Sequence, residues 1–220
     1  MNYIKLNWLW KRCLFALKQT PRRLFRLINM WKHPFYRNYN FKIKLYAFGL
    51  LIADVCFLFD IYEIITNLTR KHVRPLTSSE ILRGSKIFAQ HIDFTLVMLD
   101  KYSLPVKHGM AHAFVTFNTI NCCRPISPDT FIHELTHIWQ YQRFGAGYIA
   151  LALAAQKTKQ GYNYAYEPHW YLSKNIYYFN AEQQADLIED YYRIQQNIHP
   201  QWHISKKNYG DLQRLLDTMT

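Results

Sequence analysis

The sequence has few cysteines, no internal repeat and no Gly/Ser-rich linker, and each of these absences narrows the class of protein. The cysteines at positions 13, 56, 122 and 123 lack the spacing of a zinc finger, and the adjacent pair cannot readily form a disulfide with each other. No segment repeats, and none is of low complexity. The 220 residues therefore predict one globular domain with an amino-terminal attachment region.

A secretory signal is also missing. The first long apolar run begins only at Leu45 and has no small-residue cleavage site. The run Asp54-Val55-Cys56 does not fit the lipoprotein pattern. We therefore expect the protein to keep its amino-terminal region.

Acidic side chains are absent from residues 1–44, which contain 11 Lys or Arg. The other 176 residues hold 16 basic and 15 acidic side chains and are close to neutral. Because the basic character belongs to one segment, a nucleic-acid-binding surface over the whole protein is poorly supported. The segment alone could still bind a polyanion.

Large apolar side chains alternate with basic ones in residues 1–44, a composition typical of a helix on an anionic lipid surface. We expect Pro21 to break this helix into two pieces. The apolar members of the pattern are Trp8, Leu9, Trp10, Leu14, Phe15, Leu24, Phe25, Leu27, Ile28, Met30 and Trp31.

The run from Leu45 to Phe59 is apolar except for Tyr46, Gly49 and Asp54. It is shorter than the roughly 20 residues that usually cross a bilayer, and a central Asp costs about 2.5 to 3.5 kcal/mol on insertion. If the run spans, the basic flank stays in the cytoplasm and the following domain faces the other side. The alternatives are surface docking, or a helix buried in the domain through residue 68. We expect residues 1–68 to attach the protein to a membrane, with 45–68 as a transmembrane candidate.

A boundary is predicted near Asn67 to Ser79, where charged residues and Pro75 interrupt the apolar pattern. Thr77 to Glu80 provide caps for a helix from Ile81. We expect residues 80–220 to form an α+β domain, mostly helical with a small sheet.

Residues 113–120 predict one strand, because they are rich in aromatic and β-branched side chains. An edge strand at this place could bind an extended peptide by β-augmentation. The alternative is a plain core or hairpin strand. His108 and His112 are four residues apart, but Gly109 lies between them and no acid is near, so we expect them to be structural.

The run His133-Glu134-Leu135-Thr136-His137 matches the HExxH pattern of zinc metallopeptidases. Residues four apart on a helix share a face, so both histidines can bind one Zn²⁺ while Glu134 acts as a general base. Ser127 as N-cap and Gly145 as C-terminal cap predict the helix that the motif needs. Two histidines satisfied in a core are the alternative, which leaves Glu134 unexplained.

A third ligand is predicted on a second helix that begins after Asn180. Glu182 and Asp186 share its face, so Glu182 can bind the metal while Asp186 orients a ligand histidine. The alternatives are a solvated acidic face, or a ligand from His169, Glu167 or Asp190. Arg143 and Gln140 stand where a metzincin has its third histidine and its glycine, so that class is excluded.

The two motifs in this order resemble the gluzincin arrangement of thermolysin-like zinc peptidases. The resemblance implies His133, His137 and Glu182 as zinc ligands, Glu134 as the base and Asp186 as the residue that orients a ligand. More closely, HELTHIWQYQ (133–142) with EQQAD (182–186) is similar to small bacterial HExxH proteins associated with type VI secretion loci, of which one is implicated in cutting peptidoglycan.

We therefore predict a membrane-attached zinc metallopeptidase with a zincin-like domain at the bacterial inner membrane. Its catalytic domain would face the periplasm and hydrolyse peptides, with peptidoglycan peptides as the candidate substrate. Tyr164, in a tyrosine-rich loop between the motifs, is the candidate oxyanion donor. One alternative is a membrane-docked assembly protein with a structural or inactive zinc site. Another is a basic anchor that recruits a protease to nucleic acid.

Overall fold

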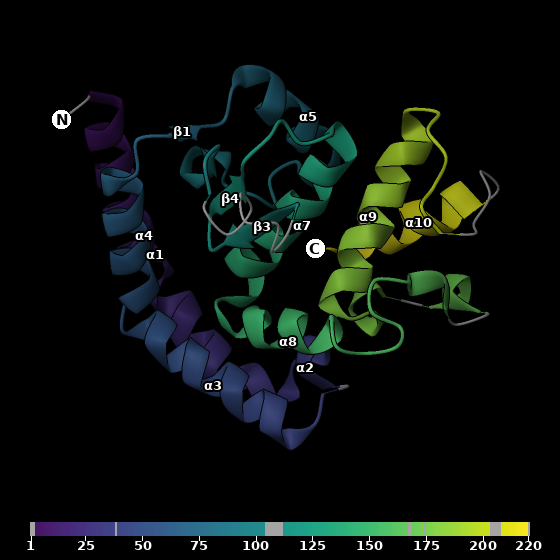
Figure 1. The fold of residues 1–220 in the computed structure, drawn as a ribbon. Coiled ribbons are helices and arrows are strands. Elements are labelled where there is room, and N and C mark those ends of the chain that lie inside the picture. The colour runs from purple at the N-terminus through teal and green to yellow at the C-terminus, as the bar shows by residue number, and fades with distance from the viewer. Residues whose placement is uncertain are drawn as a thin grey trace.

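The computed structural model describes residues 3–37, 39–103, 112–166, 169–173, 175–202 and 208–219, with side chains from residue 9 onward. Most of these residues are helical, and four short strands form a mixed sheet, so the predicted α+β class is confirmed. In Figure 1 the sheet and helix α7 lie at the centre, between α1, α3 and α4 on one side and α9 and α10 on the other.

The amino-terminal region is helical and lies along one side of the molecule (Figure 1). Helix α1 (Tyr3–Asn29) contacts both α3 (Phe41–Val55) and α4 (Leu58–Thr69), and the short helix α2 (Pro34–Arg37) precedes α3. We call α1, α3 and α4 the amino-terminal layer.

The predicted break at Pro21 is wrong, because α1 continues through this residue. A proline inside a helix removes one backbone hydrogen bond and strains the turn before it. Here Arg12 and Arg23, on either side of Pro21, both form ion pairs with Asp60 of α4. These contacts hold both halves of α1 against α4.

The apolar run from Leu45 forms two helices rather than one. Helix α3 ends at Val55, and Phe57, with φ of 60°, starts α4. Asp54 is buried and lies 3.7 Å from the guanidinium of Arg23, measured from Oδ1 to Nη1.

No helix in the described ranges is both long enough and apolar enough to cross a bilayer.

The sheet contains β1 (Val73–Pro75), β2 (Met98–Asp100), β3 (Ala113–Thr116) and β4 (Thr119–Cys122) in the order β1-β2-β4-β3. β2 and β4 are parallel, and the two outer pairs are antiparallel. β3 is therefore an edge strand. The predicted boundary at residues 67–79 contains β1, which belongs to the sheet.

The prediction of one strand over residues 113–120 is wrong, because the chain reverses at Phe117 and Asn118 to form a hairpin. Phe117 has φ of 57°, and the backbone N–H of Asn118 donates to Glu63 Oε1 at 2.9 Å. Glu63 lies on α4, 55 residues earlier, so no local signal reveals the turn.

The predicted helix caps are confirmed. Ser127 caps α7 (Pro128–Phe144), and Asn180 forms a capping box with Gln183 at the start of α9 (Ala181–Gln195). Thr77 and Glu80 form another capping box at the start of α5 (Ser78–Phe88), three residues earlier than predicted. The described residues also form α8 (Gly147–Ala155) and α10 (Tyr209–Leu216).

One hydrophobic core joins the amino-terminal layer to the rest of the molecule. It includes Leu51 of α3 together with Ile132 and Leu135 of α7. At the end of α7, Gly145 has φ of 72°, and a Cβ there would lie 2.7 Å from Asp54 Oδ2. The layer therefore packs directly against the end of the motif helix.

Candidate metal centre

Helices α7 and α9 pack against each other and bring the three predicted ligands together. Glu182 Oε2 lies 3.3 Å from His137 Nε2 and 3.7 Å from His133 Nε2. A tetrahedral zinc ion with bonds of about 2.1 Å separates its ligand atoms by about 3.4 Å. The spacing of these side chains therefore fits zinc, and we call His133, His137 and Glu182 the metal-binding cluster.

Two carboxylate oxygens at this cluster are buried without a hydrogen-bond partner in the described part of the chain. They are Glu182 Oε2 and Glu134 Oε2. A buried carboxylate oxygen without a partner is strongly unfavourable in a folded protein. A cation beside Glu182 and a polarised water beside Glu134 would satisfy both atoms. The side chains therefore suit a bound metal ion.

The far nitrogen of His133 is held by two acids. Its Nδ1 lies 3.0 Å from Asp186 Oδ1, as the sequence predicts, and 3.1 Å from Glu189 Oε2. Both atoms accept hydrogen bonds, so Nδ1 carries the proton and Nε2 is free to bind a metal. Glu189 is in turn bound by Arg193, which also pairs with Asp129 of α7 at 2.7 Å.

The partner of His137 was not predicted from the sequence. Nδ1 of His137 lies 2.9 Å from Gln140 Oε1, and the amide nitrogen of Gln140 donates to Ala181 O at 2.9 Å and to Gln184 Oε1 at 3.0 Å. The amide nitrogen of Gln140 is thus occupied as a donor, and its Oε1, which can only accept, faces His137. Nδ1 of His137 must therefore be the donor, which leaves Nε2 for the metal. The available signal was the spacing of three between His137 and Gln140, which places both on one helix face.

Helix α8 supplies a further contact to the third ligand. The side-chain amide of Gln156, just after α8, donates to Glu182 Oε1 at 2.8 Å. This bond leaves Oε2 of Glu182 directed toward the two histidines. The carboxylate is thus fixed from one side and available on the other.

The carboxylates around the histidines shift their titration. Burial lowers the pKa of His133, but its contacts with the carboxylates of Asp186, Glu182 and Glu189 outweigh burial and raise it well above 6.5. Burial also lowers the pKa of His137, and the negative charge of Glu182 more than reverses that effect. Both rings therefore hold a proton more tightly than a free imidazole, and a metal ion must displace it.

The pKa values of the two glutamates of the centre shift in opposite directions. Burial raises the pKa of Glu134, and the nearby His133 and His137 only partly oppose the increase. Burial also disfavours ionised Glu182, but its contacts with both histidines outweigh burial and hold its pKa below the usual range. Glu182 therefore stays ionised as a ligand, while Glu134 has the higher proton affinity that a general base needs.

A cavity of about 950 Å³ opens beside the metal-binding cluster. It is lined by the motif face of α7, by α8, by the cluster face of α9 and by the edge strand β3 with His112 before it. Tyr162 also lines the cavity, and its ring centroid lies 6.1 Å from that of His133. Burial raises the pKa of Tyr162 to about 12, so its hydroxyl stays protonated near neutral pH. His112, which we expected to be structural, is thus a cavity residue, whereas His108 lies outside the described residues.

The structure places Tyr164 elsewhere. Its side chain is fully buried, it does not line the cavity, and its hydroxyl donates to Asp190 Oδ2 at 2.8 Å. Asp190 lies one turn beyond Asp186 on α9 and does not line the cavity, so its contact holds Tyr164 outside the site. The prediction that Tyr164 is the oxyanion donor is therefore wrong.

Asp190 and His169, the other candidate third ligands that the structure describes, are not part of the centre. Asp190 accepts hydrogen bonds from Tyr164 and from the backbone N–H of Gln201. His169 is exposed and lines a different cavity of about 800 Å³. Glu167 lies outside the described residues.

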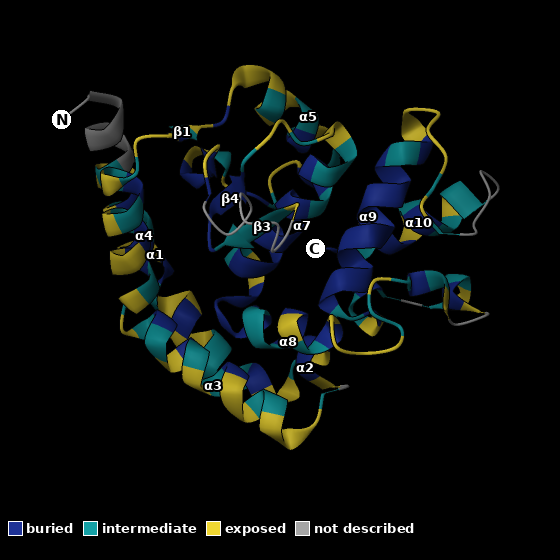
Figure 2. Ribbon diagram, viewed as in Figure 1, coloured by how far each residue is buried: buried dark blue, intermediate teal, exposed yellow. Residues whose placement is uncertain are grey.

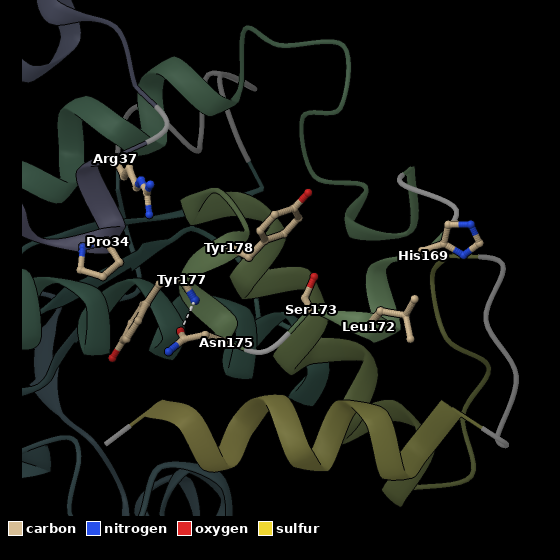
Figure 3. A pocket seen from close by; sticks show the side chains of 8 residues that line it. All are labelled: Pro34, Arg37, His169, Leu172, Ser173, Asn175, Tyr177 and Tyr178. Atoms are coloured by element: carbon tan, nitrogen blue, oxygen red, sulfur yellow. Dashed lines mark hydrogen bonds between the residues drawn. The ribbon is translucent and has the colours of Figure 1, made fainter.

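That second cavity has no comparable chemistry among its described residues. Figure 3 shows that the side chains of Arg37, His169 and Tyr178 stand apart and do not converge on one point. The hydrogen bond drawn there, from the backbone N–H of Tyr177 to Asn175 Oδ1 at 2.8 Å, only caps a short turn. We therefore assign the candidate site to the α7/α9 cavity.

Comparisons with known proteins connect the chain with type VI secretion. No family model matches the sequence. No solved structure matches it either. The chain is 42% identical over 136 residues to the type VI secretion system spike protein VgrG2b of Pseudomonas aeruginosa, a match that covers 54% of this chain and 13% of that protein. The chain is thus similar to a limited part of a type VI secretion protein, in agreement with the resemblance found in its motifs.

Proposed function

We propose that this protein is a zinc metallopeptidase of a type VI secretion system that hydrolyses peptide bonds, with peptidoglycan peptides as its substrate class. The observation that carries this proposal is the convergence of His133 Nε2, His137 Nε2 and Glu182 Oε2, with the buried Glu134 carboxylate beside them. Similarity to part of a type VI secretion spike protein supports the secretion context.

The residues of the centre have distinct roles in this proposal. His133, His137 and Glu182 would hold the metal ion. Bound zinc would acidify a water molecule and polarise the scissile carbonyl group. Glu134 accepts a proton from the attacking water and later delivers it to the leaving amine. Asp186 keeps the His133 ring in the tautomer that binds the metal.

The cavity also suits an extended peptide. Within the described residues, strand β3 is an edge strand with one side unpaired, and its first residues line the cavity. An extended chain can add to such an edge through main-chain hydrogen bonds. The Tyr162 hydroxyl, in place of Tyr164, is the donor that we assign to the oxyanion.

The substrate assignment has a consequence for location. Peptidoglycan stem and cross-link peptides lie in the periplasm, so the catalytic region would act there.

Extended D- and L-amino-acid peptides of this kind are short and polar. They need a groove that is open to solvent, and His112 and Tyr162 at the cavity are both exposed.

The test uses zinc-loaded full-length protein with purified peptidoglycan and with defined cross-linked and linear stem peptides. Glu134→Gln should lower the rate of peptide-bond hydrolysis by about 10²- to 10⁴-fold, because the base is lost while the side-chain volume is kept. Zinc content should not change. Glu80→Gln, a surface glutamate of α5 outside the cavity, is the matched control and should retain full activity.

Equal hydrolysis by wild type and Glu134→Gln would contradict the proposal. So would zinc-loaded wild type that releases no amine from any of these peptides. That second result would favour a structural zinc site in an assembly protein.

A further inference from the structure

The amino-terminal layer has an inverted pattern of burial. In α1, Arg12 is 0% exposed and Arg23 is 2% exposed, whereas Ile28 is 74% exposed. The exposed apolar residues recur at helical spacing and form one stripe, while the buried arginines lie on the opposite face. The exposed stripe of this helix and the turn after it consists of Trp10, Leu17, Leu24, Phe25, Ile28 and Trp31.

Helix α4 shows the same inversion, and α3 also exposes large apolar side chains although its buried residues include Ala47 and Leu51. In α4, the buried face carries Asp60, Glu63 and Asn67. The exposed residues on the opposite face of α4 are Leu58, Ile61, Tyr62 and Ile65, and those of α3 include Phe41, Leu45, Tyr46 and Ile52. Exposed positions of α3 and α4 lie on the side turned away from the sheet (Figure 2). A helix on a water-exposed surface normally has the reverse arrangement.

The three apolar stripes lie on adjoining helices. α1 contacts α3 and α4 directly, and the Trp31 ring stacks on Phe41 with centroids 6.0 Å apart. Single exposed apolar residues are ordinary, but this many on three adjoining helices indicate an interaction site.

The charge of this surface has one sign. Residues 1–69 contain three carboxylates, on Asp54, Asp60 and Glu63, and all three are buried against Arg12 or Arg23. The exposed charged residues in the described part of the layer and its connections are basic: Lys11, Lys18, Arg22, Lys32, Arg37 and Lys42.

We propose that the outer face of α1, α3 and α4 docks in the plane of an anionic lipid bilayer. Trp, Leu, Ile and Phe would enter the boundary between headgroups and acyl chains, while the basic side chains bind lipid phosphates. A second copy of the chain would place one basic surface against another. Charge complementarity therefore favours anionic lipid over a second copy of the chain.

This surface is separate from the candidate metal centre. None of the residues that line the 950 Å³ cavity belongs to α1, α3 or α4. Lipid docking therefore goes beyond the proposed peptidase activity and does not depend on it. Changes on the outer face should alter lipid binding while zinc content and hydrolysis of soluble peptides stay constant.

The test is co-sedimentation of the full chain with vesicles of phosphatidylethanolamine and phosphatidylglycerol at 3:1, and with phosphatidylcholine vesicles. We expect binding to the anionic vesicles, with at least a tenfold weaker partition to phosphatidylcholine or at 1 M salt. The double variant Leu17→Glu/Ile65→Glu should weaken partition to anionic vesicles by at least tenfold. Leu82→Glu on α5 is the matched control, since Leu82 is 61% exposed and Leu17 is 65% exposed, and it should bind like wild type.

Thermal unfolding and zinc content of each variant show whether its fold is intact. Absence of wild-type binding to anionic vesicles would overturn the proposal, as would equal binding by the double variant and Leu82→Glu. A concentration-dependent dimer that Leu17→Glu/Ile65→Glu abolishes, without vesicle binding by wild type, would assign the face to a second copy instead.

Discussion

The amino-terminal layer and the α7/α9 pair both bury several charged side chains, but they satisfy these charges differently. In the layer, Arg12 and Arg23 lie against Asp54, Asp60 and Glu63, so each carboxylate has a guanidinium within 4 Å. The α7/α9 pair instead gathers four carboxylates around two histidines, and among the described residues an arginine pairs with only one of the four, Glu189. Mutually paired charges beneath a helix layer indicate structure, whereas excess negative charge at an open cavity indicates a cation.

The largest effect that should separate the two regions is the loss of a buried arginine. Arg12→Met leaves Glu63 buried without its guanidinium partner and Asp60 with Arg23 alone, and should lower the free energy of unfolding by about 3 to 5 kcal/mol. Zinc content of the protein that remains folded should be unchanged. Urea unfolding and elemental analysis on the same samples measure both quantities.

Arg22→Met, at an exposed arginine of the same helix, is the control and should change the free energy of unfolding by less than about 0.5 kcal/mol. Adding Glu63→Gln to Arg12→Met should recover part of the loss, because fewer unpaired charges stay buried. Loss of zinc without loss of stability in Arg12→Met would break the distinction between the two regions.

A smaller effect is expected at the residue that orients His137. Gln140→Met removes the acceptor for Nδ1 and should weaken zinc binding by about 10- to 100-fold, as loss of such outer contacts typically does. Competition with a fluorescent zinc chelator measures the change. Gln142→Met is the control on the same helix, since Gln142 bonds to Asp93 and Asn118 and does not line the cavity. Equal zinc affinity in the two variants would mean that Gln140 does not contribute to zinc binding.

The smallest effect is predicted for a surface ion pair, whose strength can be compared with that of the buried charges. The side chain of Arg74 lowers the pKa of Glu80 to about 2, against burial, and a hydrogen bond from Thr77 helps. A lowered pKa adds stability above pH 4.5, and that stability is lost as the pH falls toward 2. Because solvent screens the pair, Glu80→Gln should cost only about 0.5 to 1 kcal/mol at pH 7.

That difference between wild type and Glu80→Gln should shrink steadily below pH 4.5 and vanish near pH 2. Urea unfolding at a series of pH values follows it. A loss as large as that of Arg12→Met would mean that exposed and buried pairs in this protein do not differ in strength.

The candidate site could be predicted from the sequence because its geometry is local. Spacing of four residues placed His133 with His137 and Glu182 with Asp186, and the caps at Ser127 and Asn180 fixed both helices. Glu189 continues the stripe of Glu182 and Asp186 at the next turn, yet an acidic stripe reads equally well as a solvated face. Only the packing of α9 on α7 distinguishes the two.

The amino-terminal layer could not be predicted in the same way because its partners are distant in sequence. Arg23 donates to Asp54 and Asp60, 31 and 37 residues away, and these contacts hold both sides of Pro21 against α4. From the sequence alone, Asp54 is an unfavourable charged residue inside an apolar run. In the structure it is half of an ion pair, and the apolar residues around it face outward.

The central claim is that His133, His137 and Glu182 hold a catalytic zinc ion. The most direct test is zinc content by elemental analysis of wild type, Glu134→Gln, Glu182→Gln and the Glu80→Gln control, purified side by side. The account predicts one zinc per chain in wild type, Glu134→Gln and Glu80→Gln, and a large loss of zinc in Glu182→Gln. Full zinc occupancy in Glu182→Gln would contradict the three-ligand centre and the peptidase proposal that depends on it.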